Sequence, residues 1–418
     1  MKRIIISGMI GNGLEWYDYA LYGQVAWLLA KLFFPAGDEA VQLLAAFGVF
    51  AAGFLVRPLG AAFFGWIGDK YGRKPAMVLA ILMMAIPTGA IGLLPTYAEI
   101  GMLAPILLTI IRLLQGISLG GEFSGSIAYI VEHAPRHRRG IAGAASLISL
   151  MLGFILGIIV VRSTMSYLGQ AAFEEWGWRI PFLVGIFIGL IGFYIRHYCD
   201  ESPVYEQAKA HNSLSKTPIR SAFKQYPWQM LQGFGAYISV TMPFYLTTVF
   251  FITFMKNHLG VAADDAMKIT LYNMVAMLLT IPISAHISDK IGRRRIMMAA
   301  AIAMMLAAIP LFLTFEKGVD VSILGMAQFG FCLLLGVYMG PVAAMLVELF
   351  PTSVRFSGMA ISYNLAAAIF GGSAPLVCEW LITKTGSNVS ISYYIIFCNA
   401  ISLISLYYYK DNFKKELH

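Results

Sequence analysis

The sequence carries five polar or ionisable side chains inside stretches that are otherwise apolar. Glu15 and Asp18 are three residues apart and would share one face of a helix. Arg112, Gln115 and Glu122, at spacings of three and seven, would form a stripe on a second helix. A charge at mid-depth in a membrane costs at least ~2.5–3.5 kcal/mol, so it needs a partner or a water-filled cavity. An arginine facing acids across such a cavity can hold a carboxylate bidentately and can exchange its acid partner for that carboxylate.

The acids of these two stripes are also candidate proton carriers. Burial favours the neutral form of a carboxyl group, whereas a neighbouring arginine favours the ionised form. A carboxylate solute arriving at Arg112 would release an acid to take up a proton, and the candidates are Glu15, Asp18 and Glu122. The alternative is a permanent structural ion pair between Arg112 and Glu15 or Asp18, because a buried pair does not by itself indicate function.

Aromatic and hydroxyl side chains accompany these charges. Trp16 and Tyr19 flank the acids and could hold an ammonium group against their ring faces, although aromatic residues in membrane helices also serve packing. Arg162 either reaches the membrane surface or faces the same cavity as Arg112, where two guanidinium groups would favour a di- or tricarboxylate. The candidate substrate-binding residues are Trp16, Tyr19, Arg112, Gln115, Arg162, Tyr237, Tyr245, Tyr338 and Asn364.

The elements that must position these residues are long apolar helices. Hydrophobic residues make up 59% of the 418 residues and charged residues 12%, and the mean hydropathy is +0.72. Such a chain cannot cover itself with polar surface, so lipid must surround it, and its apolar runs are too long and uniform for barrel strands. At ~20 residues per span, the sequence predicts an all-α membrane protein with twelve transmembrane helices at about 4–32, 41–67, 76–95, 100–132, 141–168, 178–198, 227–255, 264–288, 296–315, 321–348, 357–383 and 390–409.

An internal repeat divides these helices into two sets of six. The segment Gly68–Lys74 recurs as Ser288–Arg294, and Val131–Arg139 recurs as Val347–Arg355 at nearly the same offset. Two independent matches indicate two pseudo-symmetric six-helix bundles. We expect an N-terminal bundle at 1–199, a cytoplasmic linker at 200–226 and a C-terminal bundle at 227–418.

The repeated segments lie where charged pairs could control a movement of the bundles. An acid at the end of a helix can pair with an arginine or with the terminus of another helix. Pairs that break when the halves rock would act as a gate; otherwise these loops are static and serve orientation alone. The candidate gating residues are Asp69, Arg73, Glu132, Arg139, Asp289, Arg293, Glu348 and Arg355. We expect Arg57 to have a structural role beside Pro58.

The distribution of charge sets the orientation of the chain. The net charge of +8 comes from basic residues in alternate loops, a pattern that predicts a multi-pass protein of the cell inner membrane with both termini in the cytoplasm. No basic domain exists outside the loops, so nucleic acid is not an expected partner. The four cysteines lack the spacing of a metal site or a disulfide framework. With no nucleotide loop or nucleophile elbow, we expect no cofactor, no metal and no enzymatic activity.

Several segments carry a family resemblance. The segment Gly68–Lys74 resembles the signature loop of the major facilitator superfamily, and the chain as a whole is similar to its metabolite:proton symporter branch. That branch includes carriers of proline and betaine, of citrate and 2-oxoglutarate, and of shikimate. The resemblance implies the major facilitator fold, in which helices 1 and 4 line the central cavity. The other matching segments are Gly11–Asp18, Val56–Gly60, Arg112–Glu122, Trp176–Phe182, Phe350–Arg355 and Gly371–Gly372.

We therefore expect a secondary active transporter that carries a small carboxylate-bearing solute, such as a di- or tricarboxylate, inward with a proton by alternating access. The alternatives are symport of a zwitterionic osmolyte such as proline or betaine, export of a drug or siderophore, and, from a different class, a non-transporting membrane sensor. The expected partners are the solute, protons and the lipid bilayer. We expect a monomer, because each chain would hold a complete pathway.

Overall fold

The computed structural model describes residues 2–35, 37–70, 73–120, 123, 127, 130–131, 134–197, 223–316, 318–351 and 354–415. Helices dominate these residues, and no strand occurs among them. The helices are α1 (Lys2–Phe33), α2 (Glu39–Leu55), α3 (Arg57–Lys70), α4 (Arg73–Leu93), α5 (Tyr97–Ile100), α6 (Leu103–Ser118), α8 (Arg139–Leu168), α9 (Gln170–Ala172), α10 (Arg179–His197), α13 (Pro227–Tyr245), α14 (Phe251–Asn257), α15 (Ala263–Ile291), α16 (Arg293–Leu313), α17 (Val321–Leu349), α18 (Arg355–Ala366), α19 (Ala374–Thr385) and α20 (Ser390–Tyr408), with the short turns η1 (Arg136–Arg138), η2 (Phe173–Gly177), η3 (Leu246–Phe250) and η4 (Ala367–Gly371).

The described helices account for each of the predicted spans. Eight of them are long and apolar enough to cross a membrane, and the bent pair Gln170–Gly177 and Arg179–Tyr194 makes a ninth. The 32-residue helix α1 and the shorter apolar helices Val78–Leu93 and Leu103–Ser118 supply the rest. The predicted all-α membrane fold is confirmed. The predicted linker lies outside the described residues as far as residue 222.

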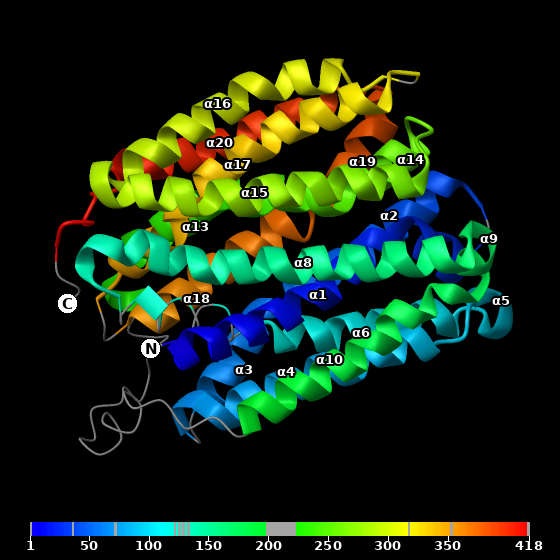
Figure 1. The fold of residues 1–418 in the computed structure, drawn as a ribbon, viewed down its shortest axis with the longest axis horizontal. Helices are drawn as coiled ribbons and strands as arrows, with labels where there is room; N and C mark the ends of the chain where they lie inside the picture. The colour runs from blue at the N-terminus through cyan, green and yellow to red at the C-terminus, as the bar shows by residue number, and fades with distance from the viewer. Residues whose placement is uncertain are drawn as a thin grey trace.

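The helices pack as two sets that meet along α8. Figure 1 shows α15, α16, α17 and α20 along the upper side of the view and α3, α4, α6 and α10 along the lower side. Helix α8 packs against α1 of the first set and against α15 and α17 of the second. Helix α2 reaches the second set through η4 and α19, and α3 through α18. The start of α1 and the end of α20 lie at the same end of the molecule (Figure 1).

Small residues bring the α2–α3 span and α6 into backbone contact. A Cβ atom added at Gly116 would lie 1.8 Å from the carbonyl oxygen of Gly53, and one added at Gly60 would lie 1.9 Å from that of Ile117. Close approach through glycine is the usual way in which membrane helices pack tightly, because lipid supplies no hydrophobic force between them. This contact fixes the position of two buried arginines, Arg57 on α3 and Arg112 on α6.

The helices that face the centre are interrupted there. Val25 of α1 has non-helical backbone angles (φ −115°, ψ 17°). The second span changes from α2 to α3 at Val56, just before Pro58, which lacks a backbone N–H. The turns η3 and η4 are wider π-type turns within the spans Pro227–Asn257 and Ser357–Thr385. Such turns frequently occur at functional sites, and discontinuous helices mark the binding site in many transporters.

The glycine contact generates a prediction with a matched control. In Gly116→Ala the new methyl group meets the Gly53 carbonyl, so we expect a loss of about 1–3 kcal/mol of stability, as for overpacking. In Gly48→Ala the methyl group meets nothing within 4 Å, and the gain in helix propensity is about 0.5–1 kcal/mol. Melting of the two variants in detergent, followed by size-exclusion fluorescence, should shift in opposite directions. Equal shifts would show that α2 and α6 do not touch as described.

Candidate functional site

Six buried side chains from both sets of helices meet in a closed circuit of contacts, which we call the central ring. Four come from the first half of the chain, and two come from α13 and α18 of the second. In order of contact around the circuit, the members are Trp16, Tyr245, Phe54, Arg57, Tyr363 and Phe123.

The aromatic part of the central ring contains one stacked pair of rings and several edge-to-face contacts. Trp16 and Tyr245 are stacked, with centroids 6.2 Å apart and planes inclined by 27°. Tyr245 meets Phe54 edge-on at 4.9 Å, and Trp16 lies 6.3 Å from Phe123. Phe244 adds a further edge-on contact to Trp16 at 5.9 Å. Such a group of faces is suited to a quaternary ammonium ion, which aromatic cages bind through the negative face of each ring.

Arg57 completes the central ring and joins the two halves. Its guanidinium carbon lies 5.1 Å from the Phe54 centroid and 5.0 Å from that of Tyr363, whose ring in turn lies 4.9 Å from Phe123. Nε of Arg57 donates to Oδ1 of Asn364 at 3.2 Å, and Nη2 donates to the Tyr363 hydroxyl. None of the described residues accepts a hydrogen bond from Nη1, although the side chain is fully buried.

Other buried polar atoms near the central ring lack a partner in the described part of the chain. They are the hydroxyl groups of Tyr19, Tyr245 and Thr241. Tyr19 lies 5.0 Å from Phe54 between ring centroids, and Thr241 is one helical turn from Tyr245. Buried polar groups are nearly always hydrogen-bonded in proteins, and each exception calls for an explanation. A cluster of such groups around a buried guanidinium is consistent with a binding place for a polar solute.

Asp18 belongs to a second cluster, which lies within the first set of helices. Its Oδ1 accepts a hydrogen bond from the Thr88 hydroxyl, and its Oδ2 accepts one from Nε2 of Gln115 at 2.9 Å. Nη1 of Arg112 donates to Gln115 at 2.8 Å and lies 3.6 Å from Asp18. The same guanidinium stands 4.4 Å over the ring of Tyr22. The structure therefore brings Arg112 and Gln115 of α6 together with Asp18 of α1 and Thr88 of α4, all in one half of the chain.

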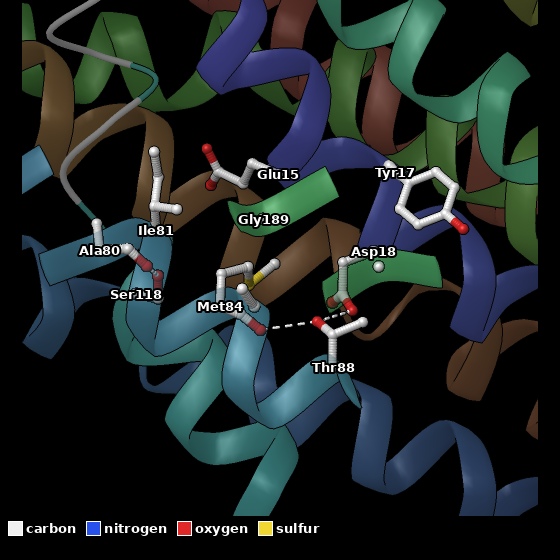
Figure 2. A pocket seen from close by; sticks show the side chains of 11 residues that line it. Glu15, Tyr17, Asp18, Ala80, Ile81, Met84, Thr88, Ser118 and Gly189 are labelled. Carbon is white, nitrogen blue, oxygen red and sulfur yellow. Dashed lines mark hydrogen bonds between the residues drawn. The ribbon is translucent and has the colours of Figure 1, made fainter. Parts of the chain in front are cut away.

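A cavity of about 30 Å³ lies beside this cluster, between α1, α4, α6 and α10. Its lining includes Glu15, Asp18 and Thr88, and its volume is enough for about two water molecules. Figure 2 shows the Asp18 side chain pointing from α1 toward Thr88, while the Glu15 carboxylate is turned in another direction. Glu15 also interacts electrostatically with Arg57. The two acids thus serve different clusters: Asp18 the network within one half, and Glu15 the surroundings of the central ring.

The remaining predicted binding residues fall in several places. Tyr237 packs edge-on against Tyr363 at 4.8 Å and so borders the central ring. Tyr338 donates to the backbone of Ala236 within the second set of helices. Glu122 lies outside the described residues.

Arg162 lies near the end of α8, beside the start of α15. Its Nε is 2.7 Å from Oδ1 of Asp264, and both side chains are about one-third exposed (36%). The structure does not bring Arg162 to Arg112, so it does not place two guanidinium groups in one cavity, which was one of the two alternatives for Arg162. At the same end, Nζ of Lys256 stands 3.3 Å over the ring of Trp27. Both contacts join the first half of the chain to the second.

A buried ion-pair network joins the halves at the opposite end. Asp289 accepts hydrogen bonds from the first backbone amides of α8, with N–O distances of 2.8 Å for Gly140 and 3.3 Å for Ile141. Nη1 of Arg293 lies 2.7 Å from Asp289, and its Nη2 lies 3.0 Å from Glu348. An acid at a helix N-terminus is stabilised by the helix dipole and the free amides. Three predicted gating residues, on α15, α16 and α17, therefore form one network that also contacts the start of α8.

The other predicted gating residues are less completely described. Arg139 donates to the backbone oxygen of Lys415 at 2.8 Å, which also joins the two halves. Arg355 donates to the backbone oxygen of Phe350 at 3.0 Å. Asp69 and Arg73 occupy the end of α3 and the start of α4, with side chains outside the described set, and Glu132 lies outside the described residues.

Sequence reasoning did not predict the contacts of Arg57 with the second half of the chain. Its neighbour Pro58 suggested a structural motif near the cytoplasmic end, but the arginine lies within the single span Glu39–Phe64 and is fully buried. The signal was available, because the rule that a charge inside a span needs a partner or a site applies to Arg57 as it does to Arg112. The partner itself was not readable, since Tyr363 and Asn364 are more than 300 residues away in the chain.

Comparison with known proteins agrees with this architecture. Two family models match the chain: Sugar (and other) transporter over residues 4–225, and Major Facilitator Superfamily over residues 230–417. The proline/betaine transporter of Escherichia coli K12 is 32% identical over 414 residues, covering 97% of this chain and 82% of its own length. The ectoine/proline transporter ProP of Corynebacterium glutamicum is 33% identical over 431 residues, covering 100% and 85%.

Solved structures show the same fold. The D-xylose-proton symporter matches with a TM-score of 0.75 at 18% identity, over 100% of this chain and 98% of that chain. A partially occluded, inward-open form of the xylose transporter XylE from E. coli matches with a TM-score of 0.76 at 18% identity, over 99% of each chain.

Two sets of membrane helices around a buried polar centre define the class as a transporter of small solutes, and not an enzyme. The chain belongs to the major facilitator superfamily. The resemblance seen in the sequence motifs is thereby confirmed.

The contact between Arg162 and Asp264 can be tested by a charge swap. Arg162→Asp replaces the cation that faces Asp264 with an acid and should weaken the closed arrangement at this end, while adding Asp264→Arg restores opposite charges and should recover part of it. Spin labels at the exposed positions Tyr167 and Val321 would report the distance between α8 and α17. We expect longer distances in the single variant than in the double variant. Identical distributions in all variants would exclude Arg162 from holding the outer ends together.

Proposed function

We propose that the protein is a proton-coupled symporter of a small zwitterionic solute that carries one carboxylate and one ammonium group, as proline and betaine do. The observation that carries this proposal is the central ring, in which stacked aromatic faces and one arginine meet between the two halves. The relatives named for proline, betaine and ectoine support the same class of solute.

The solute class differs from the di- or tricarboxylate expected from the sequence. A solute with two or three carboxylates would need several cations at the centre, and Arg162 was one candidate for the second of them. That residue is instead paired with Asp264 at the outer end. What accompanies the central arginine is a set of aromatic rings, with Trp16 stacked on Tyr245, and these favour a cation. The osmolyte alternative is therefore better supported than the organic acid.

Proton coupling is proposed for the cluster around Asp18. This carboxylate is buried, holds two side-chain hydrogen bonds and lies 3.6 Å from Arg112, so its charge is compensated inside one half. The adjoining cavity has room for the water through which a proton would travel. Glu15 lines the same cavity and interacts with Arg57, which connects the proton cluster to the central ring. Protonation of either acid would change the charge that faces the solute.

Alternating access is proposed to use the contacts at the two ends. The Asp289–Arg293–Glu348 network and the Arg162–Asp264 pair both connect the halves, and each would open while the other stays closed. We further propose the domain division at 1–199, 200–226 and 227–418, an inner-membrane location with both termini in the cytoplasm, and action as a monomer. The start of α1 and the end of α20 at one end of the molecule agree with that orientation (Figure 1).

Uptake into proteoliposomes separates the solute classes. We expect accumulation of radiolabelled proline or glycine betaine when the outside is acidic, and abolition of that accumulation by a protonophore, because the gradient is the energy source. Citrate and 2-oxoglutarate should neither accumulate nor compete. Concentrative uptake of citrate would overturn the proposal of zwitterion:proton symport. Accumulation of betaine that is unaffected by the protonophore would overturn it as well.

Asp18→Asn tests the proton carrier. The amide keeps the shape but cannot gain or lose a proton, so we expect loss of gradient-driven accumulation while exchange of internal for external solute persists. Thr88→Val, which removes the Asp18 hydrogen bond but leaves the carboxylate, serves as a comparison. It should retain accumulation at a reduced rate. Full gradient-driven accumulation by Asp18→Asn would remove this residue from the coupling.

A further inference from the structure

We propose that Arg57 binds the solute carboxylate and that the bound carboxylate takes the place of the Tyr363 hydroxyl at the guanidinium. This inference rests on the proposed function and specifies which atoms recognise the anionic end. It assigns a recognition role to a residue that motif position alone would make structural.

The hydrogen bonds of Arg57 leave part of its donor capacity unused, and an anion could use it. A guanidinium group offers five N–H donors in a planar fork that matches a carboxylate in bidentate geometry. Two of its nitrogens donate to neutral acceptors on α18, and Nη1 has no acceptor in the described part of the chain. A carboxylate placed across Nη1 and Nη2 would gain two charge-assisted hydrogen bonds. The bond that must be given up is the neutral one to Tyr363.

Arg112 is a poorer candidate, although it is equally buried. Its Nη1 is held by Gln115 and lies 3.6 Å from Asp18. Its guanidinium is covered by the rings of Tyr22 at 4.4 Å and Tyr19 at 4.8 Å. These four neighbours all belong to the first half of the chain. Arg57, in contrast, contacts both halves, so it lies where alternating access requires the solute to bind.

The order of contacts in the central ring also places the two ends of a zwitterion. Arg57 touches Phe54 and Tyr363, whereas Trp16 touches Tyr245 and Phe123, so the arginine and the tryptophan occupy opposite positions in the circuit. A carboxylate on Arg57 would direct the ammonium group of a small solute away from the guanidinium. That direction leads to the stacked faces of Trp16 and Tyr245, where a cation is favoured.

Exchange of partners at Arg57 would link binding to the movement of the halves. In the solute-free arrangement the arginine holds α18 through Tyr363 and Asn364. A solute that replaces Tyr363 loosens one of these two bonds between the halves and supplies its own contacts to both. The solute would shift the equilibrium between the two arrangements of the halves because it makes different contacts in each, and a ligand can shift such an equilibrium only by that difference in binding free energy.

The test uses the full-length protein in lipid nanodiscs and a matched pair of ligands. Glycine betaine and choline carry the same trimethylammonium group, but choline has no carboxylate. Calorimetric titration should show that Arg57→Lys raises the Kd for betaine at least about tenfold, or ~1.4 kcal/mol, and leaves the Kd for choline unchanged. Tyr363→Phe removes the competing hydroxyl and should lower the Kd for betaine. Arg295→Lys, at an exposed position, serves as the control and should match the wild type.

The outcomes separate this inference from the proposed function. Suppose that the wild type binds and accumulates betaine, and that Arg57→Lys either changes the affinities for betaine and choline equally or changes neither. The assignment of the carboxylate to Arg57 is then overturned, while the proposed function stands. If Tyr363→Phe weakens betaine binding, the exchange of partners is overturned. If the wild type neither binds nor transports any zwitterion, the proposed function fails and this inference with it. Retained choline binding in Arg57→Lys shows that the aromatic part of the site is folded in that variant.

Discussion

A charged side chain inside a membrane span must find its partners within the protein, and the centre of this structure is arranged around that requirement. Leaving such a charge without compensation costs several kcal/mol. Asp18 satisfies the requirement inside one half, through Thr88, Gln115 and Arg112. Arg57 satisfies it across the two halves, through neutral groups on α18. The first arrangement can survive a rocking movement unchanged, whereas the second cannot, and this difference separates a stable proton cluster from a changeable binding place.

The packing of the backbone supports the same division. Helices α2, α3 and α6 are joined by glycine contacts so close that no side chain fits between them. That contact makes the first half a rigid frame on which Arg57 and Arg112 keep a fixed relation. The second half meets this frame at the centre mainly through aromatic rings and hydroxyl groups, such as those of Tyr245 and Tyr363. Rings can slide and re-pack at modest cost, which suits a surface that must separate and close again in each cycle.

The twelve helices and their repeat were predictable because hydropathy and a duplicated motif are local or periodic signals. The grouping of Asp18 with Arg112 and Gln115 was also predictable, since each stripe follows from helical spacing. The contact partners of Arg57 and Arg162 could not be predicted in this way. Arg57 follows the break at Val56 and owes its position to α18, far away in the chain. Arg162 is paired with Asp264, which lies about 100 residues further along the chain.

The solute class illustrates why spacing along the chain was insufficient. A multiply charged anion was favoured by the alternative in which Arg162 shares one cavity with Arg112. Arg162 is paired with Asp264 away from the centre, and Arg112 is enclosed by tyrosine rings and Asp18. Among the described residues, Arg57 is then the cation of the central ring. One guanidinium can balance one carboxylate, and the aromatic faces opposite it can balance one ammonium group.

Under the proposed function the net charge of the bound solute is then zero, so the proton is the net charge that moves. Linkage requires that solute and proton favour each other's binding by the same factor. The Glu15 carboxylate, which lines the cavity near Asp18 and acts electrostatically on Arg57, lies where that coupling would pass.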